Sequence, residues 1–225
     1  NYSGAVEVVV LGVAGLDTLV VNGSASPEEM DVSASSVLTD RGDVLFNLDE
    51  IDVEALTVNG LQGADTFNVV TGLIPIFIDG GDPICSGDLL SITATTSAEF
   101  SPGPESDEGS FIIDGNPPVS FDHIEAIEVG DPDNGNDLVV TVMGTNADDD
   151  ITAQGLAPTV VAVSVNAGPA VVYSGVGTLI LQGKNGDDDI VVDVNVEALD
   201  IEIFVDGGLA TTASDRLRVT GVDGV

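Results

Sequence analysis

The residues best suited to chemistry in this sequence are aspartates that recur in glycine-rich turns. In three places the pattern is Gly-x-x-Gly-x-Asp-x-apolar, with the aspartates at Asp17, Asp65 and Asp188. A fourth copy, which ends on Asp137, has a loop two residues longer. A carboxylate held by a tight turn supplies an oxygen ligand, and several flexible oxygen ligands favour Ca²⁺ over Mg²⁺.

Other acids crowd the same turns, so a cation is expected to be needed there. Carboxylates stacked one strand spacing apart repel each other by about 1 kcal/mol in water and by more near protein. We therefore predict Ca²⁺ on the turns, with 130–137 and 183–189 as the favoured sites. The predicted ligands are Asp65, Asp88, Asp131, Asp133, Asp137, Asp187, Asp188 and Asp189. The alternative is that these aspartates only stabilise Asx-turns and face solvent.

The glycine-aspartate turn resembles the repeat of hemolysin-type (RTX-like) calcium-binding β-rolls and the turns of Gly/Asp-rich repetitive bacterial surface proteins. In the β-roll family, glycine permits the tight turn and aspartate binds Ca²⁺ between successive turns. The resemblance implies an extracellular or cell-surface repeat protein on a parallel β-solenoid. The motifs here are not tandem nonapeptides, so the resemblance does not extend to a continuous row of Ca²⁺ ions.

Catalytic side chains are scarce. His123 is the only histidine and Cys85 the only cysteine, so neither a Ser-His-Asp arrangement nor a disulfide framework is expected. Paired carboxylates for glycoside hydrolysis are available, but the acids sit on repeated turns, which favours a structural role for them. We predict that the chain is not an enzyme and that His123 is structural. A β-helical glycan-active enzyme is the catalytic alternative.

Charge and hydropathy restrict the partners. The chain has 39 Asp and Glu residues against 4 Lys and Arg residues, a formal net charge of −35, which repels nucleic acid and anionic membrane surfaces. The stretch 151–183 has no charge and is long enough to span a membrane, but glycine and proline interrupt it and its apolar residues alternate. We therefore expect several strands there, no membrane span and no nucleic-acid partner.

The elements that position the turns are expected to be short strands, because runs of Val, Ile, Leu and Thr alternate with Gly, Asn and Asp. The motif aspartates are 48, 72 and 51 residues apart, close to two, three and two units of about 24–25 residues. The positions that fill the intermediate steps are Asp43, Asp88, Asp114, Val163 and Asp215. The spacing predicts an all-β parallel β-solenoid of about nine coils of roughly 24 residues. Two tandem antiparallel β-sandwiches are the alternative, because a longer repeat of about 125 residues is domain-sized.

One repetitive segment is expected to span residues 1–225, starting and ending mid-repeat, with a loop insertion at 99–110. An acidic rod of this kind is typical of a structural component of an extracellular surface fibre, filament or adhesin. Open solenoid ends predict end-to-end self-association into a filament, or continuation of a longer chain. A calcium-dependent carbohydrate- or partner-binding module is the second function considered. The valines between 160 and 165 predict an exposed protein-contact face.

Overall fold

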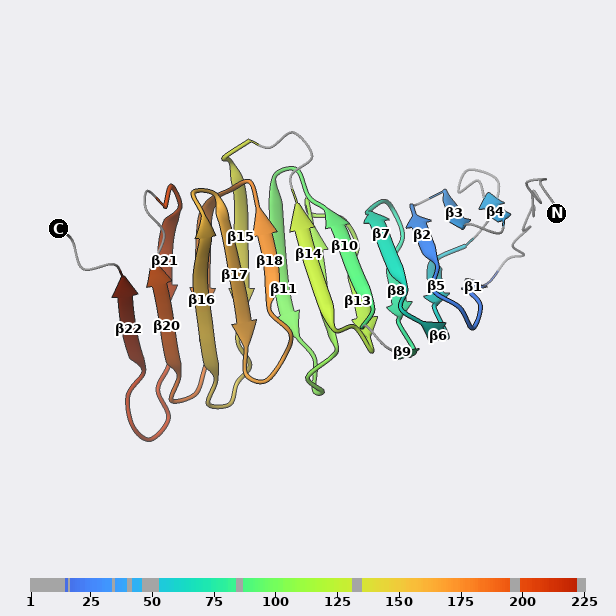
Figure 1. Ribbon diagram of the computed structural model, residues 1–225. Coiled ribbons are helices and arrows are strands. Elements are labelled where there is room, and N and C mark those ends of the chain that lie inside the picture. The colour runs from blue at the N-terminus through green and yellow to red at the C-terminus, as the bar shows by residue number, and fades with distance from the viewer. Residues whose placement is uncertain are drawn as a thin grey trace.

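The protein is all-β, with two large sheets and one small one. The computed structural model describes residues 15, 17–33, 35–39, 42–45, 53–83, 87–130, 135–194 and 199–221. Within these ranges the chain forms 22 strands and no helix, and therefore no helix that could span a membrane. The strands stack into an elongated body that runs from the N-terminal end to the C-terminal end (Figure 1).

Sheet A has nine strands and sheet B has eleven. In spatial order, sheet A consists of β1 (Thr18–Asn22), β5 (Ala55–Asn59), β8 (Ile76–Asp79), β13 (Val119–Asp122), β12 (Gly109–Ile113), β11 (Ser97–Pro102), β15 (Leu138–Met143), β19 (Val176–Gln182) and β21 (Glu202–Asp206). Sheet B consists of β22 (Arg216–Gly221), β20 (Asp189–Val194), β16 (Asp150–Ala157), β17 (Val160–Val165), β18 (Val171–Ser174), β14 (Ala126–Gly130), β10 (Leu89–Thr93), β7 (Thr66–Val70), β2 (Glu29–Val32), β3 (Ser36–Thr39) and β4 (Gly42–Leu45). The short strands β6 (Gln62–Gly63) and β9 (Asp82–Pro83) pair in parallel outside both.

The chain crosses repeatedly from sheet A to sheet B, as a solenoid does. Among the described strands, seven of sheet A (β1, β5, β8, β13, β15, β19 and β21) are followed along the chain by a strand of sheet B. Strands one coil apart pair in parallel and in register, for example Leu56 with Ile76 and Leu90 with Ile127. Equivalent side chains therefore stack along the body.

Three antiparallel excursions interrupt this pattern, so a purely parallel solenoid is not confirmed. At β11–β12–β13 and at β16–β17–β18 the chain runs ahead by two strand positions and then returns through antiparallel strands. A third excursion, β2–β3–β4, lies at the N-terminal end of sheet B. Residues 99–110, expected as a loop, belong largely to the β11–β12 hairpin, and only 103–108 form its loop.

The core lies between the two sheets and is one continuous cluster. Alternate residues of each strand point inward, as in β10, where Leu90 and Ile92 are buried between more exposed neighbours. The row that begins at Met30 and Phe67 continues through Leu90 to Ile127, because the strands keep their register. Periodic burial of this kind explains why a sequence with few aromatic residues still forms an ordered interior.

The uncharged stretch 151–183 forms strands, as expected, but its predicted contact face is wrong. Val161, Val163 and Val165 point into the core and are at most 5% exposed. The outward positions of β17 are Val160, Ala162 and Ser164, and each is only half-buried. The valine run therefore does not give a broad exposed apolar surface.

Candidate functional site: two acidic ladders

An acidic residue immediately precedes every strand of sheet B that is entered from sheet A. These acids stack into two rows, because the strands that follow them are in register. The N-terminal ladder is Glu28, Asp65, Asp88 and Glu125, and the C-terminal ladder is Asp149, Asp188 and Asp215. Of these seven side chains, the two-sheet body buries Glu28, Asp65, Asp88, Asp149 and Asp188.

Every ladder carboxylate after the first of its row accepts a hydrogen bond from the backbone of the preceding rung. In the N-terminal ladder, the Glu28 backbone N–H donates to Asp65 Oδ1 at 2.8 Å, and that of Asp65 donates to Asp88 Oδ1 at 2.7 Å. The Asp88 N–H donates to Glu125 Oε2 at 2.6 Å. The C-terminal ladder repeats the arrangement, with 2.9 Å from Asp149 N to Asp188 Oδ1. The acids therefore join neighbouring coils at the edge where sheet B begins.

Glycine at the start of the crossing makes room for the carboxylate. A Cβ on Gly60 would lie 2.7 Å from Asp65 Oδ2 and 2.6 Å from the Gly80 carbonyl oxygen of the next coil. A Cβ on Gly183 would collide with Asp188 Oδ2 in the same way. The first glycine of the sequence motif is thus required by close approach of a buried acid.

The second oxygen of three rungs has no hydrogen-bond donor. Oδ2 of Asp65, Asp88 and Asp188 is buried and unpartnered, and each of these residues is at most 1% exposed. Desolvation raises the pKa of all three carboxyls, and it raises the pKa of Asp88 to about 6, with the negative charges of Asp65 and Glu125 adding to the shift. A buried carboxylate oxygen of this kind requires either a proton or a cation.

The other predicted metal ligands lie outside the ladders. Asp187 is half-buried and accepts hydrogen bonds from Thr212 and from the backbone of 211–213, which lower its pKa. Asp189 pairs with Arg216, which lowers the pKa of the carboxyl. Asp137 is exposed at the start of β15, a strand of sheet A. Asp131 and Asp133 lie outside the described residues.

The ladders offer few oxygens to a calcium ion. Each of these three rungs has one oxygen without a hydrogen-bond donor, whereas Ca²⁺ takes six to eight oxygen ligands. In the part of the chain that the structure describes, one group of at least three metal-ligating side chains converges within 4.8 Å, and it contains Asp107, Asp122 and His123. Sequence reasoning assigned His123 only a structural role. The buried rungs therefore suit a proton better than a fully coordinated Ca²⁺.

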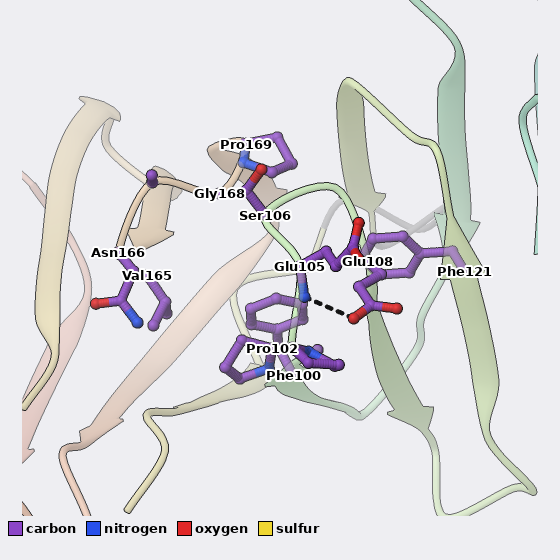
Figure 2. A pocket seen from close by; sticks show the side chains of 13 residues that line it. Phe100, Pro102, Glu105, Ser106, Glu108, Phe121, Val165, Asn166, Gly168 and Pro169 are labelled. Carbon is purple, nitrogen blue, oxygen red and sulfur yellow. Dashed lines mark hydrogen bonds between the residues drawn. The ribbon is translucent and has the colours of Figure 1, made fainter. Parts of the chain in front are cut away.

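A cavity of about 190 Å³ lies where two of the excursions meet. Figure 2 shows it between the 103–108 loop of the β11–β12 hairpin and the turn that follows Val165. Phe100 and Phe121 line its inner side, and their rings stack with a centroid separation of 6.5 Å. Glu105 and Glu108 lie at its rim, where the Glu105 N–H donates to Glu108 Oε1 at 2.6 Å.

No protein-family model, curated protein or solved structure matches this chain.

Proposed function

We propose that this chain is a structural segment of an extracellular surface fibre, filament or adhesin, in which two-sheet bodies stack end to end. The observation that carries the proposal is the state of the C-terminal end of the core. The last strands of the two sheets, β21 and β22, bring inward-facing apolar residues to this end without covering them. A protein whose body is a stack of coils can continue the stack through such an end.

The exposed core end is extensive. Ile203 pairs with buried Leu179 and Val219 pairs with buried Val192, so these side chains continue rows of the core. Leu217 and Val219 are nevertheless 53% and 63% exposed. Around them lies an open hollow of about 600 Å³, lined by the apolar residues Val192, Val194, Leu199, Ile201, Ile203, Val205, Leu217 and Val219. The outer edges of β21 and β22 pair with no other strand among the described residues, and an apolar surface beside such edges favours association.

Strand direction favours a second copy of this chain as the occupant. All sheet A strands that cross to sheet B are parallel, so β21 of one copy can pair in parallel with β1 of the next. The steps β2–β3–β4 extend sheet B two strands beyond β1 and give β4 the direction of β2, so β22 can pair in parallel with β4 as the alternative to the β21–β1 pairing. A contact of this head-to-tail kind does not close on itself, and it propagates into a filament.

Charge also supports this arrangement. Of the four Lys and Arg residues of the chain, Arg216 and Arg218 lie on β22 at the open end. Two copies that met through this end would bring these like charges together, which disfavours tail-to-tail contact.

Sedimentation and electron microscopy of the chain test the proposal. We expect concentration-dependent assembly into rods for the unmodified chain, and its loss on Val219→Lys, because a lysine would place charge in the contact. Leu73→Lys is the matched control, since Leu73 is 80% exposed elsewhere on the body. A concentration-independent monomer, or assembly that Val219→Lys leaves intact, would overturn stacking between copies and leave continuation of a longer chain as the explanation.

The second candidate is a calcium-dependent carbohydrate- or partner-binding module, and the cavity between the two excursions favours it. Its aromatic floor and carboxylate rim are suited to a small polar ligand. Nuclear magnetic resonance titration with neutral mono- and disaccharides, with and without Ca²⁺, tests this function. Amide shifts confined to 100–108 and 165–169 would support it, and unchanged spectra at saturating sugar would exclude it.

A further inference from the structure

The only histidine of the chain occupies a position that is glycine in every equivalent described turn. Within the described residues, seven strands of sheet A lead into sheet B. Six of them are followed at once by glycine, namely Gly23, Gly60, Gly80, Gly144, Gly183 and Gly207. After β13 the residue is His123, and the ladder acid Glu125 follows only two residues later. This turn therefore departs from the repeat in both residue type and length.

The backbone of His123 has an unusual conformation for a residue with a side chain. Its φ is +54°, in the left-handed region that a non-glycine residue rarely adopts. The imidazole is about half exposed, with 51% of its side-chain surface accessible. Its Nδ1 lies 2.9 Å from Asp79 Oδ1, on the neighbouring strand β8. A neutral imidazole that donates its Nδ1 proton to a carboxylate keeps a lone pair on Nε2.

Two more carboxylates, from different elements, lie beside this ring. Asp122 is the last residue of β13, and its Oδ2 is 3.8 Å from His123 Nδ1. Asp107 comes from the loop of the β11–β12 hairpin, whose backbone carbonyl accepts the Ile124 N–H at 3.2 Å. One ligand atom from each of Asp107, Asp122 and His123 lies within 4.8 Å of the other two.

We propose that His123, Asp122 and Asp107 bind a divalent transition-metal ion of the Zn²⁺ class, and that the hydrogen bond to Asp79 holds the imidazole beside the two carboxylates before the metal binds. Ligands of tetrahedral zinc lie about 3.3–3.5 Å apart, given metal–ligand distances of about 2.0–2.1 Å. The three ligand atoms, which lie within 4.8 Å of one another, therefore come closer together when the metal binds. Nitrogen and carboxylate ligands together suit Zn²⁺, whereas Ca²⁺ takes oxygen ligands alone.

The proposed metal site differs from the acidic ladders in its ligands, and the proposal does not depend on end-to-end assembly. The ladders consist of carboxylates and backbone groups, and none of their rungs contains a nitrogen ligand. A surface with 35 excess negative charges attracts any cation, so selectivity for a nitrogen-preferring metal is what distinguishes this site from general attraction. The site therefore needs to be tested with the carboxylates already saturated by another divalent ion.

Isothermal titration with ZnCl₂ in excess millimolar CaCl₂ tests the proposal. We expect one Zn²⁺ per chain, together with a shift of the imidazole Hε1 and Hδ2 resonances, which belong to His123 because there is no second histidine. Absence of saturable Zn²⁺ binding in Ca²⁺, or binding that leaves these resonances unmoved, would overturn the assignment.

Substitutions identify the ligands. His123→Gly restores the residue of the six other turns and is expected to keep the fold, which melting and sedimentation verify. Both His123→Gly and His123→Gln are expected to weaken Zn²⁺ binding by about tenfold or more, and Asp107→Asn is expected to weaken it as well. Glu99→Gln, which removes an exposed acid outside the cluster, is the control and should bind as the unmodified chain does. Unchanged affinity in either His123 variant would contradict the proposal.

Discussion

At the scale of single residues, three ladder carboxylates each have one oxygen that stabilises the fold and one that destabilises it. One oxygen of Asp65, Asp88 or Asp188 accepts a backbone N–H from the neighbouring coil, while the other is buried without a donor. A charge-assisted hydrogen bond stabilises the coil contact, but an unpartnered anionic oxygen opposes burial. Protonation lowers this cost, because it removes the negative charge from the buried carboxyl.

The first prediction follows from the raised pKa of Asp88. Its folded-state value of about 6 lies above the ordinary 3.8, so the folded protein binds this proton more tightly than the unfolded chain does. The stabilising contribution is fully present below pH 3.8 and is lost as the pH rises through about 6. Its upper bound is about 3 kcal/mol, reduced by screening near the sheet edge. We expect Asp88→Asn to raise the melting temperature at pH 8 and to reduce the gain on going to pH 5.

Asparagine removes the buried negative charge, so the sign of the change in melting temperature at pH 8 is the decisive result. Asp200→Asn is the matched control, because Asp200 is exposed and loses the same charge. Equal changes in the two variants would mean that net charge alone is responsible.

The second prediction concerns the glycines that face the ladder. Gly60→Ala places a Cβ against both Asp65 Oδ2 and the Gly80 carbonyl, so the buried acid has to move. We expect a loss of about 2–4 kcal/mol in unfolding free energy by denaturant titration. Gly130→Ala should cost much less, because the atom nearest to its new Cβ is the Ser174 hydroxyl at 3.1 Å. Similar losses in both variants would show that glycine is needed at these positions only for its backbone conformation and not to make room for the buried acid.

At the scale of elements, one aspartate fixes the turn that begins the largest excursion. Asp114, at the end of the β11–β12 hairpin, accepts hydrogen bonds from the backbone and side chains of Thr95 and Thr96 and from the Ser97 backbone. Although burial opposes the shift, these bonds lower the pKa of Asp114 to about 2. The third prediction is that Asp114→Ala destabilises the protein by about 1–3 kcal/mol at pH 7.

The pH dependence of this residue has the opposite sign to that of Asp88. Because its pKa is depressed, the contribution of Asp114 is present above pH 3.8 and is lost as the pH falls through about 2. The difference in unfolding free energy between the unmodified chain and Asp114→Ala should therefore shrink between pH 4 and pH 2. A difference that stays constant over this range would contradict the role assigned to the ionised carboxylate.

The sequence predicted the strands and the acidic turns well, but it did not predict the coil lengths. The Gly-x-x-Gly-x-Asp pattern identified Asp65 and Asp188 as equivalent, and both are ladder rungs. It also grouped them with Asp17 and Asp137, which precede strands of sheet A instead. The second glycine of the motif caused this error, because a ladder turn does not need it. Gly144 lies against the ladder acid Asp149, and no glycine lies between them in the sequence.

The excursions explain the remaining errors. Ladder rungs are 23 or 27 residues apart where a coil is plain, and 37 or 39 apart where a coil includes an antiparallel excursion. A strand that pairs within an excursion has the same alternation as one that continues the solenoid, because both are buried on one side. The choice between them depends on tertiary pairing, and so does the meeting of Asp107 with His123.

At the scale of the whole molecule, the net charge of −35 opposes the compact stack. The ladders and the exposed turns repeat acids along one edge of sheet B, so repulsion adds up along the body instead of averaging out. The end-to-end association proposed above opposes this repulsion, because it removes the apolar residues at the C-terminal end from water. Both effects depend on ionic strength, since screening reduces the repulsion between copies as well as within one.

The last prediction is that Ca²⁺ raises the thermal stability of the chain by more than screening alone. The exposed turns bring the two groups of acids around Asp148 and Asp187 together, and the Asp187 N–H donates to Asp148 Oδ1 at 2.9 Å. Extracellular oxygen sites bind Ca²⁺ with Kd of about 10⁻⁴–10⁻³ M, and a hundredfold excess over Kd contributes about 2.7 kcal/mol. Melting in EGTA, in millimolar CaCl₂ and in NaCl of matched ionic strength measures the effect. If NaCl reproduces the whole rise in melting temperature, specific Ca²⁺ sites are excluded, and the acidic edge is stabilised by general screening and by protons on its buried rungs.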